Sequence, residues 1–287
     1  MALLTNPESG QGKAIRATEH ARARFVQRGV DVEVLSGDSA QRSRELARKA
    51  VAAGVEALVV VGGDGLISLV LQEIAGSEVP MGIIPAGTGN DLARHFEIPR
   101  SDAAAAADVV LDGQVSTVDL GCAGDTLFGT VVATGFDSRV TRRANAMRWP
   151  KGSLRYTVAA LVEVAWLQPF HYRIELDDRI VETDALLVAV GNTSWYGGGM
   201  KICPAADPRD GMLDVTVVGV TDRGRVARLL PTIFSGRHVE IEGVSTYRSR
   251  RVRLDAHTTA DTDGEPLGTL PLDLHAEPAA LRLLIPN

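Results

Sequence analysis

The chain has 287 residues, 45% of them hydrophobic and 23% charged, which is ordinary for a globular protein with one large or two modest domains. The formal net charge of -6 argues against a general nucleic-acid binder, so no nucleic-acid partner is expected. The two cysteines, Cys122 and Cys203, lie far apart, and we interpret them as buried thiols of a reducing cytoplasm rather than as a disulfide.

The sequence predicts neither a leader peptide nor a membrane span. Met1–Leu4 run directly into Thr5-Asn6-Pro7, which is too short for the apolar region of a signal peptide. No stretch approaches the ~18 uninterrupted apolar residues of a membrane span. We therefore expect a cytoplasmic protein that touches a membrane at most peripherally, at the inner membrane face.

The first third of the chain alternates between strand and helix patterns. Strands are predicted at residues 2–4, 30–35, 57–61 and 81–84, and helices at residues 13–28 and 39–53. This βαβ rhythm predicts an α/β domain with a parallel sheet, helices on both faces and a site at the carboxyl ends of the strands.

The rhythm changes after about Gly113. Strands are predicted at residues 115–123, 126–133, 170–176, 180–190, 213–220, 251–254 and 270–274, with helices near residues 154–166 and 222–234. The pattern predicts a second, mainly antiparallel β domain.

Two glycine-rich loops follow successive predicted strands, Gly62–Gly65 and Pro85–Asp91. Glycine permits close backbone approach, so successive N–H groups can cradle phosphate oxygens. Asp64 and Asp91 cannot bind phosphate directly, and must act through Mg²⁺, a water or a hydroxyl proton. The structural alternatives are a tight strand-to-helix turn at the first loop, and at the second a cap on a helix over residues 92–96.

A third loop, Asn6–Gly10, follows the first predicted strand, and Lys13 and Arg94 are candidate phosphate ligands. Taken alone, each cation is more typical of a solvated surface residue than of a phosphate ligand. Two further segments are rich in carboxylates. Residues 207–214 could bind a hard cation or form a polar turn, and residues 261–265 resemble a common hairpin turn.

Taken together, these motifs resemble the bacterial diacylglycerol kinase and lipid kinase family, which shares its catalytic domain with sphingosine and ceramide kinases. The matching motifs lie at residues 6–10, 62–65, 85–91, 192 with 197–199, 210–214 and 263–265, in the order of the family. Residues 129–150 look like the actinobacterial diacylglycerol kinases in particular. Leu66 differs from the threonine of many bacterial members and matches the sphingosine-kinase branch.

The resemblance implies a nucleotide-binding α/β domain at residues 1–120, completed by residues 279–287, and a β-rich lipid-binding domain at residues 121–278, with the active site in the cleft between them. The cofactors that it implies are ATP and Mg²⁺. The residues predicted to bind ATP are Asn6, Pro7, Ser9, Gly10, Lys13, Ser36, Gly62, Gly63, Gly65, Ser68, Gly87, Thr88 and Asn90.

The same resemblance implies the catalytic and metal-binding residues. Glu265 corresponds to the family's proton acceptor, and Asp64 and Asp91 are expected to position catalytic Mg²⁺, directly or through water. A structural Mg²⁺ site is implied at the side chains of Asp207 and Asp210 and the carbonyl oxygen of Met212.

The predicted function is an ATP-dependent lipid kinase that converts diacylglycerol to phosphatidic acid. The alternatives are a kinase for a sphingosine-like or ceramide-like alcohol, an NAD kinase, which also uses a Gly-Gly-Asp-Gly loop, or a catalytically silent regulator that binds nucleotide or lipid. The predicted partners are the lipid substrate, a membrane surface and, as a further option, a second copy of the chain.

Residues 138–162 suggest how such a protein could meet a membrane, since they contain six cations, interfacial aromatics and no acidic residue. The alternative interpretations are that Trp149 and Tyr156 belong to the core, that the arginines solubilise a helix face, or that one or two of these cations contact the ATP phosphates.

Overall fold

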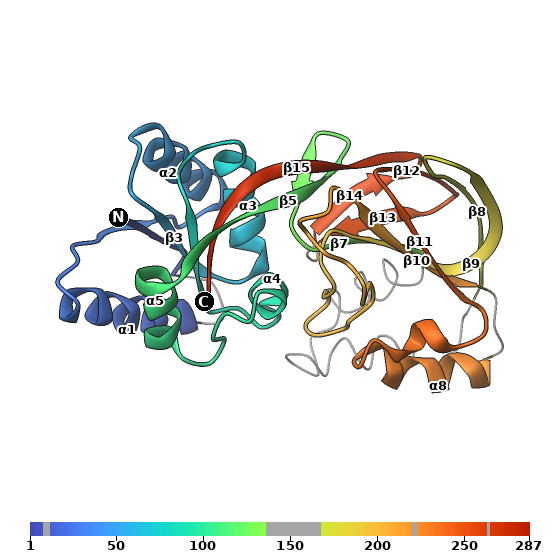
Figure 1. The fold of residues 1–287 in the computed structure, drawn as a ribbon, viewed down its shortest axis with the longest axis horizontal. Coiled ribbons are helices and arrows are strands. Elements are labelled where there is room, and N and C mark those ends of the chain that lie inside the picture. Colours follow the sequence, from blue (N-terminus) through green and yellow to red (C-terminus); the bar gives the residue numbers. More distant parts are fainter. Residues whose placement is uncertain (8–11, 136–167, 220–222, 263–264) are drawn as a thin grey trace. The chain divides into compact units, whose positions relative to one another are not determined.

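The computed structural model describes residues 1–7, 12–135, 168–219, 223–262 and 265–287 (Figure 1). The chain divides into two compact units. Unit 1 comprises Met1–Leu120 and Glu277–Asn287, and unit 2 comprises Gly121–Ala276. In the part of the chain that is described, no helix is both long and apolar enough to cross a membrane.

Unit 1 is an α/β unit built on a parallel sheet. In chain order its elements are β1 (Ala2–Thr5), α1 (Lys13–Gln27), β2 (Glu33–Ser36), α2 (Ala40–Ala52), β3 (Leu58–Gly62), α3 (Asp64–Ile74), β4 (Met81–Pro85), α4 (Asp91–His95) and α5 (Ala103–Asp112). The C-terminal part of β15 (Leu272–Ile285) completes the sheet, whose strand order is β15-β4-β3-β1-β2 with every pair parallel.

The centre of this sheet is buried on both faces, as expected for a parallel sheet between helices. All five residues of β3 are buried, and so are all five of β4. Helix α1 contacts α5, and α2 contacts α3. Ion pairs hold both helix pairs together. Arg24 Nε of α1 lies 2.7 Å from Asp108 Oδ1 of α5, and Arg44 and Arg48 of α2 pair with the Glu73 carboxylate of α3.

The remaining elements are mostly strands. They are β5 (Gln114–Ala123), β6 (Thr126–Phe128), β7 (Val131–Gly135), β8 (Phe170–Glu175), β9 (Ile180–Gly191), β10 (Leu213–Gly219), α8 (Arg223–Ile233), the 3₁₀ helix η2 (Arg237–Glu240), β11 (Val244–Ser249), β12 (Arg251–Asp255), β13 (Thr259–Thr262), β14 (Glu265–Thr269) and β15 (Leu272–Ile285). The strand pairs of unit 2 are antiparallel.

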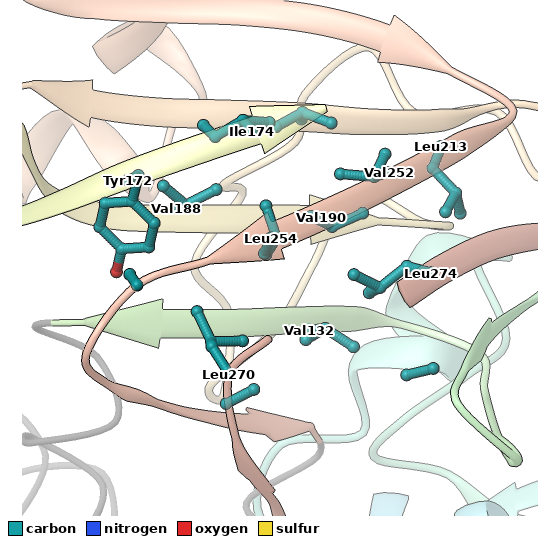
Figure 2. Packing of buried hydrophobic residues seen from close by; sticks show 14 of the residues in the cluster. Val132, Tyr172, Ile174, Val188, Val190, Leu213, Val252, Leu254, Leu270 and Leu274 are labelled. Atoms are coloured by element: carbon teal, nitrogen blue, oxygen red, sulfur yellow. The ribbon is translucent and has the colours of Figure 1, made fainter. Parts of the chain in front are cut away.

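Two apolar clusters hold unit 2 together, one on each side of β7, β9 and β10. Figure 2 shows the first, in which side chains of β7, β8, β9, β10, β12 and β15 meet around Val188, Val190 and Leu254. The second lies on the opposite side of these strands, where Leu229 and Ile233 of α8 pack with Ile202 and Cys203. Burial raises the pKa of the Cys203 thiol to about 12, so it is an inert core group.

The predicted fold class, a parallel α/β domain followed by a mainly antiparallel β domain, is confirmed. Some boundaries differ. The strand predicted at residues 126–133 is two strands, β6 and β7, and the one predicted at 270–274 continues to Ile285 as β15. Strand β11 was not predicted, because its sequence is polar and its side chains are largely exposed. The helix predicted near residues 154–166 lies outside the described residues.

Candidate functional site

Three of the loops predicted to bind phosphate lie at one edge of the unit 1 sheet. The pairing register places Ser36, Thr5, Val61 and Ile84 side by side at the ends of β2, β1, β3 and β4. The segment after β1 begins with Asn6 and Pro7, while Ser9 and Gly10 are outside the described residues. Because the strands are parallel, their carboxyl ends meet here, as the sequence predicted.

The two glycine loops touch each other through their backbones. A Cβ atom on Gly63 would lie 2.9 Å from Gly87 Cα, and a Cβ on Gly87 would overlap the Cα of Gly63. Two chains can approach this closely only where neither carries a side chain. The glycines therefore bring the loops of β3 and β4 into one surface of backbone groups.

Asn90 fixes the shape of the second loop. It adopts the left-handed conformation, with φ of 52°, and its side-chain oxygen accepts a hydrogen bond of 2.9 Å from the Gly87 N–H. Its amide group donates to the Gly87 carbonyl at 3.1 Å. Although Asn90 is the residue before α4, its side chain does not cap that helix. The alternative of capping by the Asn90 side chain is thus wrong, because the side chain is used within the loop.

Asp64 supplies the cap of α4 from the other loop. Its Oδ1 accepts the N–H of Asp91 at 2.8 Å, and the backbone N–H groups of Asn90 and Leu92 also hydrogen-bond to the carboxylate. Burial nevertheless raises the pKa of Asp64, because desolvation outweighs these hydrogen bonds. The carboxylate therefore joins the two glycine loops directly.

Asp91 is buried at the start of α4, with its Oδ1 3.4 Å from Arg94 Nε. Arg94 also donates from Nη2 to the Gly89 carbonyl at 3.4 Å. The structure thus directs the Arg94 guanidinium toward the second loop itself, where it holds the Asp91 carboxylate.

The other residues predicted to bind ATP occupy the surroundings of these loops. Lys13 is the first residue of α1 and is exposed, and Gly65 and Ser68 lie in the first turns of α3. Thr88 and Ser36 are exposed, at the second loop and at the end of β2. All of the described ones thus lie on unit 1, at or just after strand ends.

Glu265 lies on unit 2, at the first position of β14, where its side chain is exposed. It pairs with Thr262 of β13, whose hydroxyl is buried and donates to the Val131 carbonyl at 3.1 Å. The hairpin predicted at residues 261–265 is therefore present as β13 and β14, although its turn residues 263–264 are not described.

Asn192 is buried at the end of β9. Its N–H donates to the Thr130 carbonyl at 2.9 Å, and its side-chain amide donates to the Gly129 carbonyl at 3.2 Å. Since Thr130 directly precedes β7, Asn192 fixes the start of the strand that β13 pairs with. Its observed contacts are therefore structural.

The predicted metal-binding segment holds three carboxylates and is met by an arginine that the sequence reasoning missed. Asp210 Oδ1 accepts the Met212 N–H at 2.9 Å, and its Oδ2 hydrogen-bonds to Arg248. The same guanidinium lies 3.5 Å from the buried Asp214 Oδ2. Burial, the largest influence, raises the pKa of Asp214 to about 6 despite Arg248. Asp207 is exposed.

This carboxylate cluster is not brought together with Glu265. From β14 to β10 the order is β14-β13-β7-β9-β10, so the two ends are four strand spacings apart, roughly 19 Å along the sheet. No group of three or more Asp, Glu, His or Cys side chains in the described part of the chain is arranged to hold a metal ion. Glu265 is therefore separated from the carboxylates of residues 207–214 by the intervening strands.

Asp119 is a second residue that sequence reasoning missed. It is buried in β5, and its Oδ1 accepts the N–H of Ala279 in β15 at 2.8 Å. Ala279 has a left-handed φ of 54°. The sequence does contain an indication of this residue, because a carboxylate between the apolar residues Val118 and Leu120 needs a hydrogen-bond partner if it is buried.

Two family models match the chain. The diacylglycerol kinase catalytic domain matches residues 1–123, and the YegS C-terminal NAD kinase beta sandwich-like domain matches residues 130–285. The first covers the glycine loops and the second covers β7 to β15, including Glu265.

Named proteins resemble the chain over nearly its whole length. A diacylglycerol kinase of Mycobacterium tuberculosis (strain H37Rv) is 48% identical over 99% of this chain and 94% of its own length. A Pseudomonas aeruginosa (strain UCBPP-PA14) protein named probable lipid kinase YegS-like is 31% identical over 100% and 94%. The crystal structure of a diacylglycerol kinase from Bacillus anthracis (strain Sterne) has the same fold, with a TM-score of 0.73 at 20% identity over 99% of this chain and 96% of that one.

Proposed function

Because the chain belongs to the diacylglycerol kinase family, as its ordered motifs predicted, we propose that it transfers the γ-phosphate of ATP to the hydroxyl of diacylglycerol. The products are phosphatidic acid and ADP. The observation that carries the proposal is the joined pair of glycine loops at the strand ends of unit 1, on a chain whose relative at 48% identity is named a diacylglycerol kinase.

In this proposal unit 1 binds the nucleotide and unit 2 binds the lipid. The backbone N–H groups near Gly63 and Gly87 suit the triphosphate, since neither glycine has a side chain to keep phosphate oxygens away. Asn6, Ser36, Lys13 and Thr88 complete this side of the site. The residues at 9 and 10, which lie outside the described part, keep their predicted role.

Asp64 and Asp91 fit a role with Mg²⁺ in the chemistry of their donors, since carboxylate oxygens are the ligands that this cation takes. Because backbone N–H groups already hold the Asp64 carboxylate, a contact through water suits it better than direct ligation. When bound, Mg²⁺ would neutralise charge on the phosphate oxygens. The residues themselves hold the two loops in one geometry.

Glu265 is the proposed proton acceptor. The lipid hydroxyl oxygen forms a bond to the γ-phosphorus while the bond from that phosphorus to the bridging oxygen breaks. The hydroxyl proton passes to the Glu265 carboxylate, and ADP leaves. The exposure of Glu265 on the first residue of β14 supports this role, because the carboxylate is open to an incoming hydroxyl.

The structural Mg²⁺ site at Asp207, Asp210 and the Met212 carbonyl is proposed for its oxygen donors, which fit a hard cation. Asp210 shares its second oxygen with Arg248, so a cation at this position would compete with the guanidinium. We assign this Mg²⁺ a role in the stability of unit 2 alone, because the carboxylates that would bind it are remote from Glu265 in the sheet.

Replacing Asp210 with alanine should reduce the stabilisation that Mg²⁺ gives to the protein. At ten times its Kd, a ligand stabilises by about 1.4 kcal/mol, which corresponds to roughly 3–5 °C in Tm. We expect this shift in the wild type and its loss in Asp210→Ala. Melting curves with and without Mg²⁺ measure it, with Asp178→Ala, an exposed aspartate of the same unit, as control. An Mg²⁺ shift that persists in Asp210→Ala would show that residues 207–214 form an ordinary turn.

Leu66 gives little support for a different lipid acceptor. Its side chain is 5% exposed and lies against Gly62, where a Cβ atom on that glycine would be 2.8 Å from Leu66 Cδ2. The residue therefore packs beneath the first glycine loop. Sphingosine-like and ceramide-like alcohols remain the second class of acceptor to test, and NAD the third.

The test of the proposed function is phosphoryl transfer from labelled ATP to a panel of acceptors. Purified protein would be incubated with diacylglycerol, sphingosine, ceramide and NAD, and the labelled product identified. We expect labelled phosphatidic acid as the main product. Labelled NADP would support an NAD kinase, and nucleotide binding without any labelled product would support the silent regulator. We also propose a cytoplasmic enzyme that meets its substrate at the membrane surface.

A further inference from the structure

Helix α8 and the residues after it are unusually basic. Between Arg223 and Val239 there is no aspartate or glutamate, while four arginines occur, at positions 223, 225, 228 and 237. The chain as a whole has a formal net charge of -6, so this run departs from the rest. It is separate from the membrane segment predicted from sequence, residues 138–162, which lies outside the described residues.

The helix separates its apolar and basic residues. Leu229 and Ile233 are 3% and 6% exposed and pack into the apolar cluster of unit 2. Arg225 and Arg228 are exposed, and so is Pro231 between them and the helix end. In Figure 1 this helix lies along the outside of the unit 2 strands. One face is thus anchored, and the other presents cations to the surroundings.

The end of the helix adds an exposed aromatic ring. Phe234 is 55% exposed, and among the described residues it is the only aromatic one of the large apolar side chains that reach such exposure. Arg237 follows one turn later, with a side chain that is 73% exposed. We call Arg225, Arg228, Phe234 and Arg237 the α8 surface. A single exposed apolar side chain is ordinary, so what sets this surface apart is the combination of the ring with three arginines.

The α8 surface is held in place by the loop after β9. Gly236, which lies between α8 and η2, adopts the left-handed conformation, and a Cβ atom there would lie 3.0 Å from Pro204 Cβ. The Lys201 N–H donates to the Ile233 carbonyl at 3.0 Å. The Lys201 ammonium itself lies 5.5 Å from the centre of the Trp195 ring. A second cation and a half-buried aromatic side chain thus belong to the loop that supports the helix end.

This supporting loop leads back to the proposed catalytic end of unit 2. It begins at Asn192, which hydrogen-bonds to Gly129 and Thr130 just before β7. The β13 strand pairs with β7 through Thr262, and Thr262 pairs with Glu265. The helix surface and the proton-acceptor position are therefore connected within one unit by a short length of ordered chain.

We propose that the α8 surface docks the protein on an anionic lipid bilayer, with Phe234 in the headgroup region and the arginines on lipid phosphates. The inference rests on the proposed function, since diacylglycerol resides in a bilayer. Arginines attract anionic lipid and an aromatic ring suits the interface, so the charge and chemistry are complementary. The opposing acidic residues, Glu240 and Glu242, are exposed partners at 3.7 Å, which water and salt screen.

Vesicle sedimentation with the full chain tests the proposal. The vesicles would contain phosphatidylcholine with or without phosphatidylglycerol, at low salt. Each arginine near an anionic surface is worth about a fivefold change in partition coefficient, so Arg228→Gln with Arg237→Gln should lower binding to the anionic vesicles about 10- to 30-fold. Phe234→Ser should lower it by about tenfold.

The matched control is Arg16→Gln with Arg22→Gln, two exposed arginines of α1 on unit 1. It changes the net charge by the same amount, and its binding should stay within about twofold of the wild type. Three results would overturn the proposal: no wild-type binding to anionic vesicles, equal loss in the control, or unchanged binding in both α8 variants. A change in sedimentation coefficient of the free protein in Phe234→Ser, with unchanged vesicle binding, would assign the surface to a second copy instead.

Activity on a short-chain, soluble diacylglycerol separates this proposal from the proposed function. The α8 variants should keep wild-type turnover on the soluble substrate while losing turnover on diacylglycerol embedded in anionic vesicles. If the wild type binds vesicles through the α8 surface yet phosphorylates neither form, the docking proposal stands and the acceptor assignment fails. If soluble and embedded substrates are equally affected by the variants, the docking role is wrong.

Discussion

Replacing Glu265 with glutamine should lower turnover by about 10²- to 10⁴-fold, the usual contribution of a positioned general base. The amide has nearly the same shape as the carboxylate but cannot accept the hydroxyl proton. ATP binding should change little, since the proposed nucleotide loops lie on unit 1 and Glu265 lies on unit 2. Steady-state kinetics on soluble diacylglycerol, with ATP affinity from calorimetry, measure the two effects separately.

Glu182→Gln is the matched control, because Glu182 is another exposed glutamate on a strand of unit 2 and pairs with a surface arginine, Arg173. Its turnover should equal that of the wild type. A collapse of ATP affinity in Glu265→Gln with unchanged turnover at saturation would make this residue a ligand of the nucleotide rather than the proton acceptor.

Asp64→Asn should abolish phosphoryl transfer, with turnover reduced by at least about 100-fold, while the chain still folds. The carboxylate accepts backbone N–H groups at the start of α4. Asparagine keeps one side-chain oxygen but has an NH2 group in place of the other. This NH2 group is a hydrogen-bond donor, and it would face backbone N–H groups that are also donors. We expect a stability loss of about 1–2 kcal/mol, because backbone N–H groups lose an acceptor, together with the loss of turnover.

Asp102→Ala separates the two effects, because alanine removes a helix cap outside the glycine loops. Asp102 caps α5, accepting the N–H groups of Ala104 and Ala105 at 2.9 and 3.0 Å, at an exposed position. This control should show a stability change without a loss of turnover. Near-normal turnover of Asp64→Asn, measured on protein that is fully folded by circular dichroism, would remove the first glycine loop from the active site.

Much of the fold followed from the sequence alone. Continuous apolar runs such as residues 57–61 predicted buried parallel strands, because strands covered on both faces need no polar residues. Helix positions followed from periodicity, and Ser39, where one helix was predicted to begin, is the N-cap of α2. The ordered glycine and carboxylate motifs determined the family because their order spans the chain, although each motif alone is common.

The tertiary structure decided which side chains meet. No spacing rule in the sequence shows that Asp64 caps α4 across 27 positions, or that Arg248 reaches Asp210 across 38, because such contacts depend on how strands pair. Capping of the next helix by Asn90 was one alternative that the sequence left open, and the structure showed that a left-handed backbone turns its side chain toward Gly87. The exposure of Phe234 also required the structure, since an apolar residue at a helix end is buried or exposed according to what packs against it. Local preference acts through neighbours in the chain, whereas these contacts arise from neighbours in space.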